Sequence, residues 1–177
     1  MLAVAVCLVA CLSIFNLLLT LALARRTAVS GTGAPGGAPR SNRLPDGSPL
    51  PGFTARTLSD GPVTRDDLSG ELVIGFFSST CRPCLDQAPE FAEAARERPG
   101  GRAAALAVVQ GGGPLERQLL RLLDPVARVV VEPAGTGVAE ALGITVWPSF
   151  LTVDAEGRIT DRGPSAGSLP TIPARTP

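Results

Sequence analysis

Two of the four cysteines, Cys81 and Cys84, are separated by two residues in the stretch "SSTCRPCLDQAP". Pairs with this spacing occur in dithiol redox centres, in zinc sites and in short structural disulfides. A structural zinc site takes about four nitrogen or sulfur ligands, whereas the chain has no histidine and its other cysteines, Cys7 and Cys11, lie in an apolar segment. A disulfide over so short a loop adds little stability, and a chance pair of buried thiols is the remaining alternative. The pattern favours a redox dithiol that needs no metal and no organic cofactor.

The elements around the pair indicate which thiol reacts first. Residues 71–78 form a continuous apolar run typical of a strand buried on both faces, and residues 84–98 have helical composition. A thiol at the start of a helix lies near unpaired N–H groups and the positive end of the helix dipole, which favour thiolate. Cys81 is therefore the expected nucleophile. Cys84, one turn deeper, is the expected resolving thiol that attacks a mixed disulfide and releases the partner.

The two residues between the cysteines are expected to support this chemistry. Arg82 places a positive charge beside the nucleophile, and Pro83 restricts the conformations of the loop. All sixteen basic residues are arginine, and histidine, lysine and tyrosine are absent. Serine triads, cysteine–histidine pairs and Schiff-base lysines are thereby excluded. The formal net charge of zero gives no indication of nucleic-acid binding.

The N-terminal residues predict a membrane anchor. Residues 2–24 carry no charge, and as a helix rising about 1.5 Å per residue they would span the roughly 30 Å hydrocarbon core of a bilayer. A cleaved signal peptide is the alternative, because residues 22–24 read as an A-x-A cleavage site. The missing charged n-region and the length of the run favour a retained anchor over residues 1–26. Residues 27–49 are rich in Gly, Pro, Ser and Ala, which predicts a flexible linker.

The remaining sequence alternates predicted strands and helices, which indicates one α/β domain over residues 50–162. A short N-terminal hairpin turns at residues 60–62. The expected strands after it are 71–78, 103–109, 127–131, 149–153 and 158–160, and the expected helices are 84–98, 114–123 and 137–142. Residues 163–177 are predicted to be a disordered tail, because their prolines and glycines oppose a helix.

The stretch "FFSSTCRPCLDQAPEF", followed downstream by "VWPSFLTVDAEGRI", resembles the thioredoxin superfamily and specifically its membrane-anchored, TlpA-like thiol-disulfide oxidoreductases. The resemblance implies a thioredoxin-like fold with a central mixed sheet flanked by helices. It implies that Pro89 kinks the first long helix and that Pro148 is a cis-proline facing the cysteines. Trp147 and Pro148 are then expected to position an extended partner segment beside Cys81. For Trp147, simple core filling is the alternative.

The resemblance also implies an activity and a place in the cell. Relatives exchange dithiols and disulfides with protein substrates and an electron-donor protein, and the reductase direction is favoured here. A redox-inactive, thioredoxin-like protein-binding module is the alternative. Relatives generally work on the extracytoplasmic side of the membrane. Arg25 and Arg26, directly after the apolar run, favour a cytoplasmic domain by the positive-inside rule, so the extracytoplasmic side is only weakly preferred.

Two positions depart from the family pattern. Gly75 stands where many relatives have a buried acid, and Thr80 stands where many have tryptophan before the first cysteine. The acid would manage proton transfer from the resolving thiol. Glu71 and Asp86 are candidate substitutes, although each is better explained as a solvated surface charge, because carboxylates are rarely buried.

Overall fold

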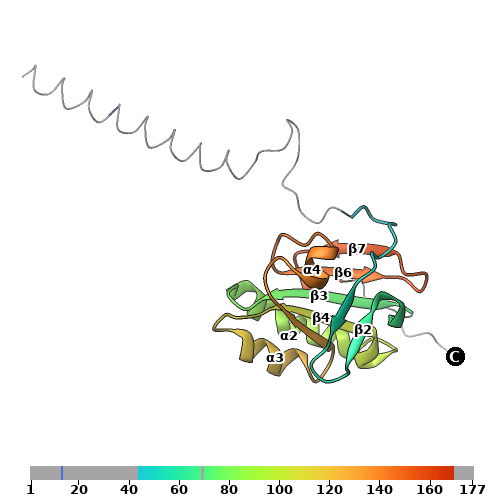
Figure 1. Cartoon of the computed structure of the whole chain (residues 1–177), viewed down its shortest axis with the longest axis horizontal. Helices are drawn as coiled ribbons and strands as arrows, with labels where there is room; N and C mark the ends of the chain where they lie inside the picture. Colours follow the sequence, from blue (N-terminus) through green and yellow to red (C-terminus); the bar gives the residue numbers. More distant parts are fainter. Residues whose placement is uncertain (1–12, 14–43, 69, 170–177) are drawn as a thin grey trace, which may run out of the picture. The chain divides into compact units, whose positions relative to one another are not determined.

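The computed structural model describes residue 13, residues 44–68 and residues 70–169 (Figure 1). Most of the predicted anchor, the linker up to residue 43 and the last eight residues of the predicted tail, 170–177, lie outside the described residues. Among the residues that are described, no helix is long and apolar enough to cross a membrane.

The centre of the domain is a five-stranded mixed sheet in the order β5-β4-β3-β6-β7. β3 and β4 are parallel, as are β4 and β5, while β6 and β7 run antiparallel to their neighbours. The strands are β3 (Leu72–Ser78), β4 (Ala105–Gln110), β5 (Arg128–Glu132), β6 (Ser149–Val153) and β7 (Ile159–Gly163). Every residue of the central strand β3 is buried, as its continuous apolar sequence predicts. The predicted mixed sheet flanked by helices is confirmed.

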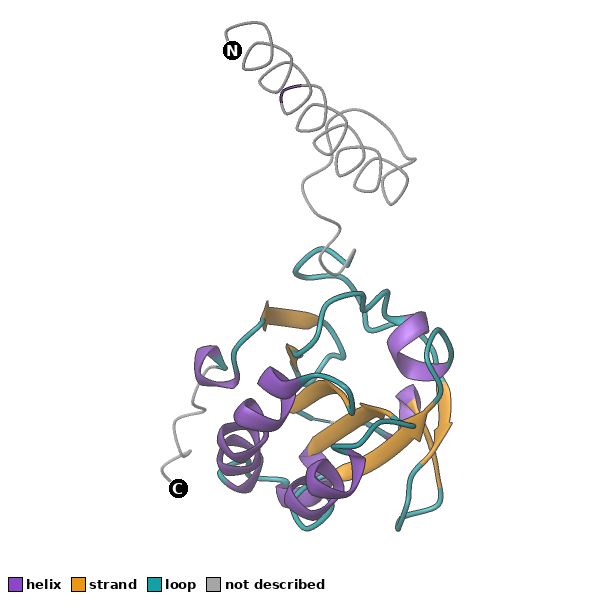
Figure 2. Ribbon diagram, turned by 90° about the vertical axis from the view of Figure 1, so that its left-hand side faces the viewer, coloured by secondary structure: helices purple, strands orange, loops and turns teal. Residues whose placement is uncertain are grey.

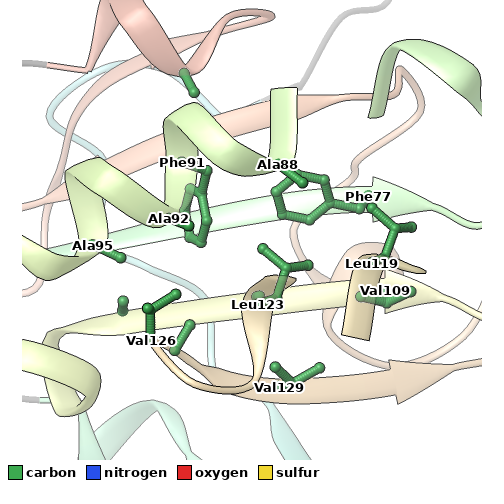
Figure 3. Packing of buried hydrophobic residues seen from close by; sticks show 14 of the residues in the cluster. Phe77, Ala88, Phe91, Ala92, Ala95, Val109, Leu119, Leu123, Val126 and Val129 are labelled. Atoms are coloured by element: carbon green, nitrogen blue, oxygen red, sulfur yellow. The ribbon is translucent and has the colours of Figure 1, made fainter. Parts of the chain in front are cut away.

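Two separate cores lie on the two faces of this sheet. The α2-side core packs α2 (Arg82–Arg96) and α3 (Glu116–Leu123) against one face, and Figure 3 shows its closely spaced side chains. The α4-side core packs α4 (Gly137–Ala141) and the hairpin of β1 (Thr54–Arg56) and β2 (Pro62–Thr64) against the other. Figure 2 shows the sheet between these layers. Alternate residues of each strand belong to the two cores, because successive side chains of a strand point to opposite faces.

Both edges of the sheet are covered by chain from the N-terminal part of the domain. On the β7 edge, the N–H of Gly47 donates to the carbonyl of Ile159 at 2.7 Å. On the β5 edge, the N–H of Leu58 donates to the carbonyl of Val129 at 2.8 Å. Covered edges present few free N–H and C=O groups for unwanted strand pairing.

The observed elements differ from the predicted ones by one or two residues at several boundaries, and by more at the C-terminal end of the domain. A 3-10 turn, η2 (Gly101–Ala104), takes the residues before β4, so this strand begins two residues later than expected. A second 3-10 turn, η1 (Arg65–Asp67), follows β2. Residues 163–169, predicted as the start of a disordered tail, complete β7 and form η3 (Ala166–Ser168). Ala166 is buried in the α2-side core, and this burial gives the segment a fixed position without a full helix.

Candidate active site

The two cysteines lie where the central strand passes into the first long helix. Cys81 is the N-cap of α2 and is partly exposed, whereas Cys84 lies in the first turn and is fully buried. Both thiols are free. The backbone N–H of Cys81 donates to the carbonyl of Ser78 at 3.1 Å, which ties the helix start to the end of β3. The predicted order, an accessible first thiol and a deeper second thiol, matches this geometry.

The turn before Cys81 is fixed by Ser79, a residue that the sequence reasoning did not single out. Its N–H donates to the carbonyl of Gln110 at 2.9 Å, and its carbonyl accepts from the N–H of Leu115 at 3.0 Å. Its hydroxyl accepts from the N–H of Gly113 at 2.8 Å. A Cβ on Gly113 would lie 2.5 Å from the Ser79 carbonyl oxygen, so only glycine allows this approach. The run "GGGP" after a strand was the available signal.

The Trp147–Pro148 peptide bond is cis, as the family resemblance implied. The Cys81 thiol donates a hydrogen bond to the Trp147 carbonyl oxygen, with a sulfur–oxygen distance of 3.7 Å. Pro148 is buried, and Trp147 is half-buried with its ring edge-on to Phe76 at a centroid distance of 6.5 Å. Trp147 therefore fills core and also contributes surface beside Cys81. The structure thus brings Trp147 and Pro148 to the nucleophile from a distant part of the chain.

The surroundings of Cys84 are almost entirely apolar. Its sulfur accepts a hydrogen bond from the N–H of Ser78 at 3.3 Å. Burial, together with the hydrogen bond to the Cys81 thiol, raises the pKa of Cys84 to about 12. Desolvation is the larger cause, because a thiolate loses more hydration than a thiol when it is buried. Cys84 therefore stays protonated in the free dithiol at neutral pH.

Gly75 lies in β3, the strand that leads to the cysteines. Aromatic rings fill the space that an acidic side chain would need at this position. A Cβ on Gly75 would lie 2.7 Å from a ring carbon of Phe77 and 2.8 Å from a ring carbon of Phe91. These two rings meet edge-to-face at 5.4 Å, and Phe91 also stacks on Phe150 at 5.9 Å. The missing acid thus coincides with an aromatic cluster that leaves no room for one.

Neither candidate substitute acid reaches Cys84. Glu71 is exposed and directly precedes β3, at the end of the strand remote from the cysteines. Asp86 forms an ion pair with Arg82 at 3.3 Å, and both side chains are largely exposed. Exposed pairs of this kind interact weakly because water screens them. The positive charge of Arg82, which was expected to act beside Cys81, is therefore paired with Asp86 and exposed to solvent.

The other two predicted supporting residues are prolines of α2. Pro83 occupies the second position of the helix, where a missing N–H costs no intrahelical hydrogen bond. Pro89 lies inside the helix and is exposed. Over residues 44–68 and 70–169, no cluster of three or more His, Cys, Asp or Glu side chains is placed to hold a metal ion.

Solved structures similar to this chain include thiol-disulfide oxidoreductases. A secreted Mycobacterium tuberculosis disulfide oxidoreductase homologous to Escherichia coli DsbE is 19% identical, with a TM-score of 0.51 over 69% of this chain and 84% of that one. The thioredoxin domain of a Bacteroides vulgatus thiol-disulfide oxidoreductase is 17% identical, with a TM-score of 0.53 over 67% and 88%. A Thermus thermophilus thio-disulfide isomerase is 21% identical, with a TM-score of 0.53 over 68% and 86%.

These similarities show that the domain has a thioredoxin-like fold. At such identities they show the fold alone, since one fold supports many functions. No family model matches the chain, and no curated protein matches it.

Proposed function

We propose that this chain is a thiol-disulfide oxidoreductase that reduces disulfides in partner proteins. The observation that carries the proposal is the paired placement of the cysteines: Cys81 is accessible at the helix N-terminus and Cys84 is buried one turn behind it. Support also comes from the Trp147 carbonyl, which lies beside the Cys81 sulfur and offers an acceptor at the reacting atom. The thioredoxin-like fold of known oxidoreductases is consistent with this activity.

The reaction follows from the two thiols. The Cys81 thiolate attacks a partner disulfide, forms a mixed disulfide and expels one partner sulfur as a thiolate. Cys84 then attacks the Cys81 sulfur, closes the Cys81–Cys84 disulfide and expels the second partner sulfur. The partner gains two electrons and the Cys pair loses two. A separate electron-donor protein with a dithiol restores the reduced pair by the reverse exchange.

The test is an insulin-type disulfide reduction assay with the purified full-length chain. We expect reduction by the wild type and background reduction by Cys81→Ser, because the serine hydroxyl is a poor nucleophile compared with a thiolate. Cys7→Ser, in the apolar N-terminal segment, is the matched control and should retain wild-type activity. Equal rates for wild type and Cys81→Ser would refute the enzyme and favour a redox-inactive binding module.

We further propose that residues 1–26 anchor the chain in a membrane and that the domain lies on its outer side. The uncharged run of residues 2–24 and the family resemblance support this arrangement, while Arg25 and Arg26 oppose it. Labelling with a membrane-impermeant thiol reagent on intact cells tests the orientation. We expect Cys81 to be labelled without lysis. Labelling that occurs only after lysis would place the domain in the cytoplasm.

A further inference from the structure

The resolving step of the proposed reaction needs a base, because Cys84 must lose its proton before its sulfur can attack. The chain has no histidine and no lysine, so the side-chain candidates at neutral pH are carboxylates and thiolates. All sixteen Asp and Glu residues belong to the described part of the chain. The position of every carboxylate in the chain can therefore be compared with that of Cys84.

Only one of these carboxylates, that of Glu132, is buried. Its two oxygens accept hydrogen bonds from the N–H groups of Val138 at 2.8 Å and Ala139 at 2.9 Å. Val138 and Ala139 belong to the α4-side core, whereas Cys84 belongs to the α2-side core. Glu132 is therefore committed to α4 on the opposite face of the sheet.

No carboxylate of the described residues is among the groups that shift the pKa of Cys84. On α2, Arg82 and Asp86 form an exposed ion pair with each other. On α3 the carboxylate of Glu116 accepts from the N–H of Gly112 at 2.6 Å, in the loop that precedes the helix. The hydrophobic cluster that includes Cys84 takes apolar side chains from β3, β4, β6 and η3, and the N–H of Ser78 donates to the Cys84 sulfur. Among the described residues, the Cys81 thiol is the one titratable side chain that acts on the pKa of Cys84.

Cys81 itself cannot serve as the base in the resolving step. In the mixed disulfide its sulfur is bonded to the partner and carries no free thiolate. The expelled partner sulfur is also badly placed, because in-line attack puts the incoming and leaving sulfurs on opposite sides of the Cys81 sulfur.

We infer that no side chain of the described residues acts as general base for Cys84, which gives its proton to solvent hydroxide, so that partner release is the slow, hydroxide-dependent step. This inference rests on the proposed function. Hydroxide takes the Cys84 proton and becomes water, and the Cys84 thiolate then displaces the partner thiolate from Cys81. The partner thiolate takes a proton from water and regenerates hydroxide. One disulfide bond forms and one breaks, and the mixed disulfide accumulates at neutral pH.

Single-turnover kinetics with the reduced full-length chain test the inference. The probe is a peptide disulfide whose halves carry a fluorophore and a quencher, and acid quenching with mass spectrometry separates mixed disulfide from product. Cys84→Ser isolates the first step, since it forms the mixed disulfide and cannot resolve it. Between about pH 6 and pH 9, wild-type decay of the mixed disulfide should accelerate about tenfold per pH unit, in proportion to the thiolate fraction.

Variants in which one carboxylate is replaced by the matching amide test whether that carboxylate acts as a base for Cys84. Asp86→Asn, Glu71→Gln and Glu132→Gln should each keep the decay rate and its pH profile within about twofold of wild type, after circular dichroism has established that each is folded. A decay rate that levels off below about pH 8, or a loss of more than about tenfold in any of these variants, would overturn the inference. If Cys84→Ser forms no mixed disulfide at all, the proposed function fails and the inference fails with it.

Discussion

Each face of the sheet buries a side chain that can carry a negative charge, Glu132 on one face and Cys84 on the other, and the two have different hydrogen-bond partners. On the α4 side, the carboxylate of Glu132 accepts two backbone N–H groups at 2.8 and 2.9 Å. On the α2 side, the sulfur of Cys84 accepts one N–H group at 3.3 Å within an apolar core. Burial raises the pKa of both groups. The comparison indicates that the first group holds a helix in place, while the second is kept as a protonated thiol.

The largest expected effect concerns the reactivity of Cys84. With its pKa raised from about 9 to about 12, its thiolate fraction at pH 8 is about a thousandfold below that of an ordinary thiol. Iodoacetamide should therefore modify Cys81 and spare Cys84 in the folded reduced chain, as measured by peptide mass spectrometry. In guanidinium chloride both should react at similar rates. Comparable labelling of Cys81 and Cys84 in the folded chain would mean that burial does not keep Cys84 protonated.

Removing the carboxylate on the other face should have the next largest effect. Glu132→Ala leaves two buried N–H groups without acceptors, which costs about 1–3 kcal/mol for each group. We expect the free energy of unfolding in urea to fall by about 2–6 kcal/mol on this basis. Glu132→Gln keeps an oxygen acceptor and should lose about 1 kcal/mol. The Cys81 alkylation rate should not change, because Glu132 lies on the opposite face from the thiol pair.

A methyl group on Gly75 tests how tightly the aromatic cluster is packed. Its Cβ would lie within 2.8 Å of ring carbons of Phe77 and Phe91, so Gly75→Ala should destabilise the domain by about 1–3 kcal/mol through overpacking. Gly52→Ala is the matched control, because a Cβ there meets nothing within 4 Å. Unfolding free energies in urea compare the two. Equal stabilities would mean that the cluster has room for a side chain, and the argument that no acid fits would weaken.

Local sequence patterns were enough to predict the element order and the position of the dithiol. The apolar run predicts β3, and the few residues around Cys81 and Cys84 predict the dithiol, so both predictions depend only on local sequence. Contacts between distant segments were not predictable in this way. Ser79 and Gly113 are thirty-four residues apart, and no period in the sequence links them. The aromatic rings that fill the space at Gly75 come from separate elements, so the sequence indicated a missing acid and gave no reason for it.

The smallest expected effect is a pH dependence of stability that arises from Glu132. Burial raises the pKa of its carboxyl above the ordinary value near 4.5, although the hydrogen bonds from Ala139 and Val138 oppose the shift. Between the ordinary pKa and the raised one, the folded state binds more protons than the unfolded state, so stability falls as pH rises through that window. The contribution is complete below the ordinary pKa and is lost above the raised one.

Glu132→Gln removes this titration and provides the reference. The difference in unfolding free energy between wild type and Glu132→Gln should shift against the wild type as pH rises from about 4, and then become constant. Urea titrations at several pH values measure it. A difference that moves in favour of the wild type with rising pH would mean that the two N–H groups outweigh desolvation. The fold would then stabilise the charged form of Glu132, whereas it stabilises the neutral form of Cys84, and the pKa values of the two groups would shift in opposite directions.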